Sequence, residues 1–104
     1  MGELDELLCQ PTRLRIMAAL MALRPDEKVD FGCLRTTLDL TDGNLGAHLQ
    51  KIEEAGYIRV EKTFVGRKPR TYLAVTDKGR AAFGDHVAAL RRIAESAAGD
   101  HPHE

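Results

Sequence analysis

The chain has 104 residues, of which 43% are hydrophobic and 30% charged, and its net charge is −1. This length predicts one compact domain with at most one additional element, and no apolar run is long enough to cross a membrane. The acidic N-terminus lacks the basic and apolar segments of a signal peptide, which predicts a cytoplasmic protein.

The charges are distributed unevenly along the chain. Residues 1–58 hold 6 basic and 10 acidic side chains, residues 59–80 hold 7 and 2, and residues 81–104 hold 2 and 4. The net charges of these segments are therefore −4, +5 and −2. A near-neutral total argues against indiscriminate nucleic-acid binding, whereas the basic middle segment is typical of a local contact with an anionic partner.

The first two predicted elements are helices. A leucine stripe with helical spacing predicts a short amphipathic helix at the N-terminus. Pro11 interrupts this helix or begins the next one, since proline is tolerated in a first turn. Residues 12–23 are apolar nearly all round, which predicts a central helix with neighbours on several sides. The stripe consists of Leu4, Leu7 and Leu8.

Two arginines and two cysteines in this part of the chain have alternative interpretations. Arg13 and Arg15 are interpreted as solvated side chains, with phosphate contacts as the alternative. Cys9 and Cys33 form no Cys-x-x-Cys pair, and a disulfide is not expected in a cytosolic chain. We expect both to be small buried hydrophobes, with a redox switch as the alternative.

Two short helices joined by a tight turn come next, which is the helix-turn-helix unit. Asp30 can cap the first helix, and Thr41 can cap the second, over residues 42–55. Gly56 stands where a helix commonly ends in a left-handed residue. The apolar stripes are Phe31, Leu34 and Leu38 in the first helix, and Leu45, Leu49 and Ile52 in the second.

The outer face of the helix over residues 42–55 carries fewer charges than an ordinary surface helix. It offers small residues, an amide, an imidazole and one ammonium group, which suits close approach to a nucleic-acid groove. The alternative is a plain amphipathic helix. The residues of this face are Asp42, Asn44, Ala47, His48 and Lys51.

The hydrophobic period then changes from 3.6 to 2. Residues 57–65 and 71–75 alternate as two strands of a β-hairpin, joined by a turn over residues 66–70. Three cations, Arg67, Lys68 and Arg70, surround Pro69 in this turn.

Thr76 can cap a last helix over residues 77–97. Its apolar residues step 4-3-4-3, as in a coiled-coil seam. No later predicted element covers this seam, so we expect a homodimer in which the N-terminal leucine stripe also takes part. The alternative is a helix folded back on its own domain. The seam consists of Phe83, Val87, Leu90, Ala94 and Ala97.

Several blocks of the sequence, in this order and spacing, carry a family resemblance over about residues 10–83. They are residues 11–16 (PTRLRI), 40–49 (LTDGNLGAHL), 53–58 (EEAGYI), 66–71 (GRKPRT) and 73–80 (LAVTDKGR). The chain resembles winged helix-turn-helix transcriptional regulators of the MarR/ArsR type, and most of all their short single-domain relatives.

This resemblance implies that residues 42–55 are a DNA recognition helix, with the hairpin as the wing. Asn44 and His48 are then the first candidates for contacts with base edges, and Lys51 for a phosphate contact. The recognition set is Thr41, Asp42, Asn44, Ala47, His48 and Lys51, and the wing set is Arg67, Lys68 and Arg70.

The predicted fold is mainly helical with a small β-hairpin: a winged helix-turn-helix domain over residues 1–76, a dimerisation helix over 77–98 and a disordered tail over 99–104. The predicted function is a sequence-specific DNA-binding transcriptional regulator, a repressor that binds a pseudo-palindromic operator as a dimer. The alternative is a winged-helix module for protein–protein contact. The basic hairpin favours DNA over that alternative.

No catalytic constellation or phosphate-binding loop is present, so we predict no enzyme activity and no cofactor. We also predict no metal site, although Asp85 and His86 with the histidines of the tail are a weak alternative. The sequence does not identify an effector ligand.

Overall fold

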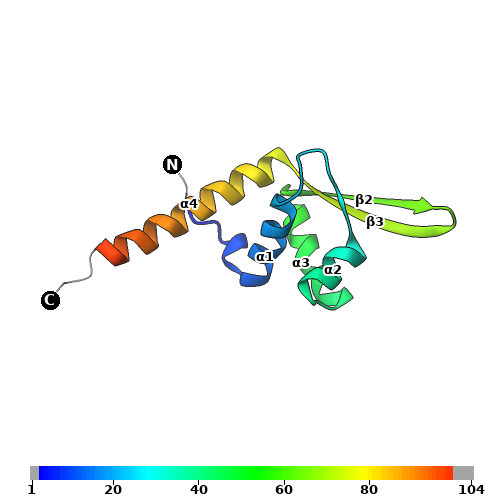
Figure 1. The fold of residues 1–104 in the computed structure, drawn as a ribbon, viewed down its shortest axis with the longest axis horizontal. Coiled ribbons are helices and arrows are strands. Elements are labelled where there is room, and N and C mark those ends of the chain that lie inside the picture. Colours follow the sequence, from blue (N-terminus) through cyan, green and yellow to red (C-terminus); the bar gives the residue numbers. More distant parts are fainter. Residues whose placement is uncertain (1–2, 100–104) are drawn as a thin grey trace.

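The computed structural model describes residues 3–99, and Figure 1 shows a helical body with one projection at each end. The β-hairpin extends from one end and the C-terminal helix from the other. The predicted fold class is confirmed. The elements in chain order are η1 (Leu7–Cys9), α1 (Pro11–Met21), β1 (Val29–Asp30), α2 (Phe31–Leu38), α3 (Asp42–Glu54), β2 (Ile58–Val65), β3 (Lys68–Val75) and α4 (Asp77–Gly99).

Local capping sets the ends of α2 and α3, as predicted. The Asp30 carboxylate accepts a hydrogen bond from a backbone amide in the first turn of α2, and the Thr41 hydroxyl does the same for α3. Asp39, with φ of 56°, makes the left-handed turn between the two helices. Gly56, with φ of 82°, ends α3 in the left-handed conformation that favours glycine.

The core lies around α1, which contacts α2, α3, α4 and β3. The prediction of a central helix is therefore confirmed. Pro11 stands at its first position, where a missing amide hydrogen costs nothing. The buried apolar side chains of the core are Leu8, Ile16, Met17, Leu20, Leu34, Leu38, Leu45, Leu49, Ile52, Ile58, Leu73 and Val75.

The sheet is antiparallel with the order β1-β3-β2. Because β1 has only two residues, paired with Tyr72 and Leu73, the hairpin beyond them is a two-stranded ribbon. The predicted turn over residues 66–70 is wrong in extent. Gly66, with φ of 65°, and Arg67 make a two-residue turn, and Lys68 already pairs with Val65.

Pro69 therefore lies within β3 and not in a loop. It pairs with Phe64, one step beyond the pair that closes the turn. In such a non-hydrogen-bonded pair the backbone nitrogen points away from the partner strand. The short β1 does not extend to this part of β3, so the missing amide hydrogen of Pro69 removes no hydrogen bond between strands.

The N-terminal prediction is corrected in two respects. The segment before α1 forms one 3-10 turn and not the predicted amphipathic helix. Only Gln10 separates this turn from Pro11, where α1 begins, which leaves no room for a longer helix. Leu8 is fully buried in the core, which removes it from the predicted dimer interface. Leu7 is partly buried against the core, and only Leu4 of the stripe is largely exposed.

The cysteine prediction is also wrong. Both Cys9 and Cys33 are exposed free cysteines. Cys33 lies on the outer side of α2, because Leu34 and Leu38 turn the other side of this short helix into the core. The two thiols therefore contribute no buried packing.

Helix α4 packs against the body only over its first part. Its start is capped by Thr76, whose hydroxyl accepts a hydrogen bond from the Gly79 amide at 3.0 Å. Phe83 is partly buried against the core, so the exposed part of the predicted seam begins beyond it. The side chains of residues 90–97 are all exposed, and this part of α4 extends away from the body (Figure 1). In residues 3–99 no helix combines the length and the apolar character needed to span a membrane.

Candidate nucleic-acid interface

The outward surface of α3 carries small and uncharged polar residues together with one cation, and the exposed carboxylate of Glu54 lies at its C-terminal end. Asn44, Ala47 and Lys51 are exposed there, as predicted. Gln50 is exposed on the same surface and was missed by the sequence analysis. Gln50 lies three residues after Ala47 and therefore on the same face of the helix, and this spacing could have predicted its exposure.

Two glycines leave the N-terminal half of α3 without side chains at two positions. A Cβ atom added at Gly43 or Gly46 would meet no atom within 4 Å. Glycine inside a helix costs roughly 0.5–1 kcal/mol relative to alanine. Packing within the chain therefore gives no reason for glycine at either position, and the helix backbone stays accessible from outside.

His48 is held against α1 and is not part of this outward surface. Arg13 Nε donates a hydrogen bond to His48 Nδ1 at 3.2 Å, and Arg13 Nη1 donates to the Leu7 carbonyl. Partial burial and the neighbouring Arg13 charge lower the pKa of His48, which favours the neutral imidazole. These contacts favour a role in positioning α3 over the predicted contact with a base.

Three other predicted residues are engaged within the fold. Thr41 caps α3, as described above. Asp42 forms an ion pair of 2.7 Å with Arg35 of α2. Arg15 is exposed and donates one hydrogen bond to the Leu38 carbonyl at the end of α2. The Arg35–Asp42 ion pair links α2 to α3, and the Arg15 hydrogen bond links α1 to the end of α2.

The cations of the hairpin have different surroundings. Arg67 lies in the exposed turn and Lys68 is exposed in the first position of β3. Arg70 is 3.5 Å from the Asp30 carboxylate, so part of its charge is balanced within the chain. Lys62, on the opposite strand, is a further exposed cation that the sequence analysis did not select.

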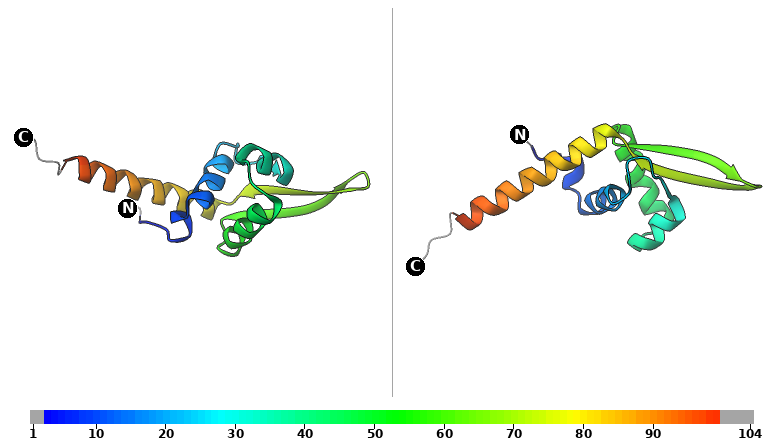
Figure 2. Two further views of the ribbon diagram at one scale, coloured as in Figure 1. Left: turned by 90° about the horizontal axis from the view of Figure 1, so that it is seen from below. Right: turned by 45° about the horizontal axis from the view of Figure 1, so that its top comes forward.

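A groove separates α3 from the base of the hairpin. Gly46 and Gln50 line it from α3, and Lys62 and Thr71 line it from β2 and β3. The hairpin extends well beyond α3 in both views of Figure 2. The outward surface of α3, this groove and the hairpin thus form one continuous surface with a basic end.

A family model described as "Winged helix DNA-binding domain" matches residues 12–94. The chain belongs to this winged helix family. We therefore call the β2–β3 hairpin the wing, and α2 with α3 the helix-turn-helix unit.

Two relatives with similar length support the assignment. The uncharacterized protein MJ0432 of Methanocaldococcus jannaschii is 34% identical over 84 residues, which cover 81% of this chain and 88% of that protein. The structure of a transcriptional regulator homologue from Pyrococcus horikoshii OT3 has a TM-score of 0.80 and 31% identity, with 89% of both chains covered.

A PadR family transcriptional regulator from Eggerthella lenta DSM 2243 shares the fold. The TM-score is 0.68 at 21% identity, and the match covers 88% of this chain and 87% of that one. This chain and that regulator therefore have the same fold.

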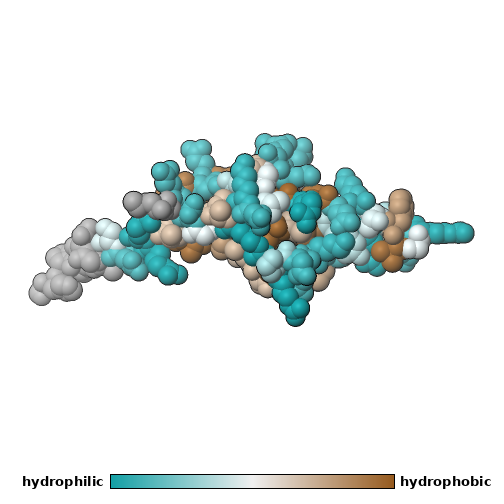
Figure 3. Space-filling view, turned by 90° about the horizontal axis from the view of Figure 1, so that it is seen from above, coloured by the Kyte–Doolittle hydropathy of each residue, from teal (hydrophilic) through white to brown (hydrophobic). Residues whose placement is uncertain are grey.

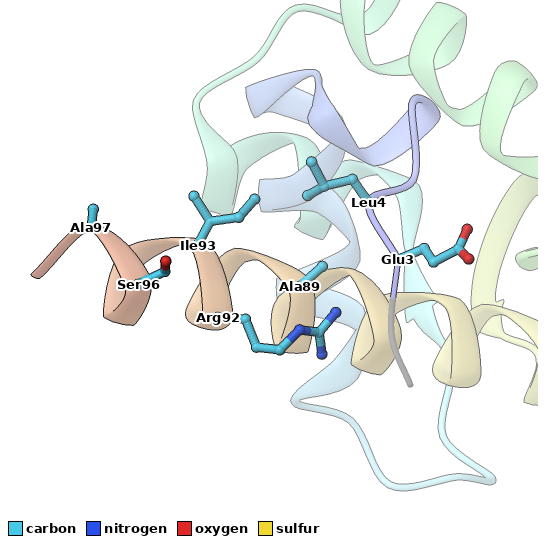
Figure 4. Close-up of a pocket in the computed structure, with 7 residues that line it drawn as sticks. All are labelled: Glu3, Leu4, Ala89, Arg92, Ile93, Ser96 and Ala97. Atoms are coloured by element: carbon cyan, nitrogen blue, oxygen red, sulfur yellow. The ribbon is translucent and has the colours of Figure 1, made fainter. Parts of the chain in front are cut away.

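A second surface lies at the opposite end of the molecule. Leu4 of the N-terminal segment and Ile93 of α4 point toward each other across a shallow groove (Figure 4). Leu4 is 47% exposed, Leu90 39% and Ile93 53%. Ile93 was missed in the predicted seam, although it lies three residues after Leu90. The large exposed apolar side chains of this end are therefore Leu4, Leu90 and Ile93.

His86 holds the N-terminal segment to α4. It is only 1% exposed, and its Nδ1 accepts a hydrogen bond from the Asp5 amide at 2.9 Å. Asp5 also accepts from the Tyr57 hydroxyl. The residues that the structure describes contain no group of three or more potential ligands placed to hold a metal ion. The tail histidines of the weak metal alternative, His101 and His103, lie outside the described residues.

Proposed function

We propose that this winged helix protein is a transcriptional regulator that binds a specific duplex DNA sequence as a homodimer. In this proposal α3 enters the major groove, with Asn44 and Gln50 facing base edges and Lys51 facing a phosphate. The wing contacts the neighbouring backbone and minor groove. Repression is the mode that we propose, because occupation of an operator needs no further surface.

The observation that carries the proposal is the outward surface of α3 beside the basic wing. Small residues leave the helix backbone accessible, and amide side chains offer both donors and acceptors to bases. The cations of the wing lie beside this surface and match the charge of a phosphate backbone. The MarR/ArsR type stays a prediction within the family, because the PadR regulator has the same fold.

Replacing Ala47 by glutamate tests the position of α3. The side chain is exposed at the centre of the outward surface, so the fold should tolerate the change. A carboxylate facing the groove of a polyanion should weaken binding to a duplex selected from a random pool by about tenfold to thirtyfold. Binding is measured by fluorescence anisotropy at near-physiological salt.

The matched control is Ala81→Glu, which makes the same change at an exposed position of α4. It adds the same charge to the protein but lies away from α3, so we expect a loss of less than about twofold. Equal losses in the two variants would show that net charge decides the effect and would contradict the placement of α3.

Replacing Arg67 by alanine tests the wing. Each phosphate contact contributes about 0.9 to the slope of log K against log salt concentration. A dimer with two wings should therefore lose about 2 units of slope in Arg67→Ala. Binding to the selected duplex is measured between about 50 and 200 mM salt.

The control for the wing is Arg24→Ala, which removes an exposed cation in the loop between α1 and β1. This loop lies on the side of the body opposite to α3 in Figure 1. We expect the slope to stay unchanged in this variant. A slope that is unchanged in Arg67→Ala as well would exclude the turn of the wing from the DNA interface.

The proposed dimer forms through α4. Leu90, Ile93, Ala94 and Ala97 lie within one stripe of the exposed part of this helix, and Leu4 lies beside it. A two-fold axis through this stripe would place two α3 helices on one side of the dimer. The operator should then be a pseudo-palindrome, with half-sites about 34–36 Å apart.

A further inference from the structure

The tip of the wing carries two large apolar side chains that the fold does not bury. Phe64 is 70% exposed and Val65 is 52% exposed. Figure 3 shows an apolar patch close to this end of the molecule, bordered by hydrophilic residues. Since β1 pairs only with residues 72 and 73, no third strand lies beside Phe64 and Val65.

The pairing of the strands places the two side chains on opposite faces of the wing. Phe64 stands opposite Pro69, and Val65 stands opposite Lys68. Side chains two residues apart share a face of a strand, so Phe64 lies on the same face as Lys62 and Val60. This face lines the groove beside α3. Phe64 therefore extends the surface assigned to DNA, and Val65 does not.

The length of the wing determines what Phe64 can reach. Four residues of β2, Lys62 to Val65, extend beyond the pairing with β1, which corresponds to about 13 Å at the rise of a β-strand. The major groove of B-DNA is about 12 Å wide. With α3 in the major groove, an extension of this length would bring the tip of the wing to the flanking backbone, at the edge of the adjacent minor groove.

We propose that Phe64 enters this minor groove as an apolar wedge, packing against deoxyribose and base edges and loosening one base step. This inference rests on the function proposed above. Phenylalanine is one of the side chains that proteins insert in this way to kink a duplex. Pro69 stands opposite Phe64 on the neighbouring strand, and Arg67, exposed in the turn, would balance phosphates at the edge of the groove.

The surrounding charges favour DNA over a protein as the occupant of this tip. Lys62 shares the face of Phe64, and Arg67 and Lys68 follow it around the turn. An apolar side chain among cations matches a groove that has sugars as its walls and phosphates at its rims. The surface is also continuous with the groove beside α3.

The test compares two forms of the selected duplex that differ only under the wing. One carries a flexible TA step there and the other a stiff A-tract. A wedge gains more from the step that unstacks easily, whereas an arginine in a narrow groove does not. The measured quantity is the ratio of the affinities for the two duplexes. We expect this ratio to fall about tenfold in Phe64→Ala.

Val65→Ala is the matched control, because it removes an exposed apolar side chain at the same height on the other face. We expect it to keep the ratio of the wild-type protein, and both variants to keep its thermal midpoint and its salt slope. A ratio unchanged in Phe64→Ala, or changed equally in both variants, would overturn the proposal.

The mass of each variant is measured by light scattering in the same experiment. A mass that changes in Phe64→Ala would assign the tip to self-association and would also overturn the wedge. Failure of the wild-type protein to bind either duplex contradicts the proposed function itself. Wild-type binding together with an unchanged ratio in Phe64→Ala contradicts only the wedge.

Discussion

Leu90→Glu is expected to divide the protein into monomers and to weaken DNA binding by about 100-fold, although Leu90 lies far from the wing. A carboxylate in the middle of the exposed stripe of α4 would have to be buried between two copies of the helix. Each half-site would then be bound by a single copy, without the gain in effective concentration that a dimer provides.

Light scattering at tens of micromolar and DNA titration measure the two effects together. Because Leu90 is the less exposed of the two, Ile93→Glu is a second variant at the more exposed position of the same stripe. Ala81→Glu on the outer side of α4 is the control and should remain a dimer. The dimer proposal fails when the wild-type protein and both stripe variants have the same monomeric mass.

Gly79→Ala is expected to destabilise the fold by about 3 kcal/mol or more. Gly79 is buried where α4 begins, and a Cβ atom there would lie 2.1 Å from the Tyr57 carbonyl oxygen and 2.9 Å from its carbonyl carbon. Both atoms belong to the backbone, so no side-chain rotation can relieve the contact. Tyr57 O also accepts the hydrogen bond from the Thr76 amide at 3.0 Å.

The same substitution five residues later has the opposite expected effect. Gly84 is exposed in α4, and an added Cβ would meet nothing within 4 Å. Gly84→Ala should therefore raise the free energy of unfolding by up to about 1 kcal/mol. Urea denaturation of both variants measures the contrast. A Gly79→Ala protein as stable as the wild type would show that α4 can move away from the end of α3 at little cost.

The sequence predicted the elements whose ends depend on local contacts. Asp30, Thr41 and Thr76 cap their helices as expected, because a cap needs only a backbone amide three residues away. Gly56 ends α3 for a similarly local reason. The alternation of apolar residues located both strands of the wing.

The errors concern contacts between distant residues. The extent of the turn depended on whether Lys68 and Pro69 would find partners on β2, which alternation on one strand does not show. Leu8 is buried because of where α1 lies, and no spacing within the N-terminal segment indicates this.

The candidate interface shows the same limit. The helical face of α3 was predicted, but the Arg13–His48 hydrogen bond joins residues 35 apart, which spacing along the chain does not indicate. His48 contacts Arg13 of α1, and Gln50 is exposed. The sequence could identify the helix that faces a partner. It could not show which residues beside the outward surface of that helix contact the rest of the chain.

Helix α4 runs without a break from the joint at Gly79 to the stripe around Leu90 and Ile93. In the proposed dimer, the length of α4 would set the distance between the two α3 helices and hence the spacing of the operator half-sites. One residue inserted between the joint and the stripe would rotate the stripe by about 100° and lengthen the helix by about 1.5 Å. An insertion of seven residues, close to two turns, would preserve the rotational phase and shift each α3 by about 10 Å, roughly three base pairs. The spacing of half-sites can therefore change only in discrete steps as such proteins diverge.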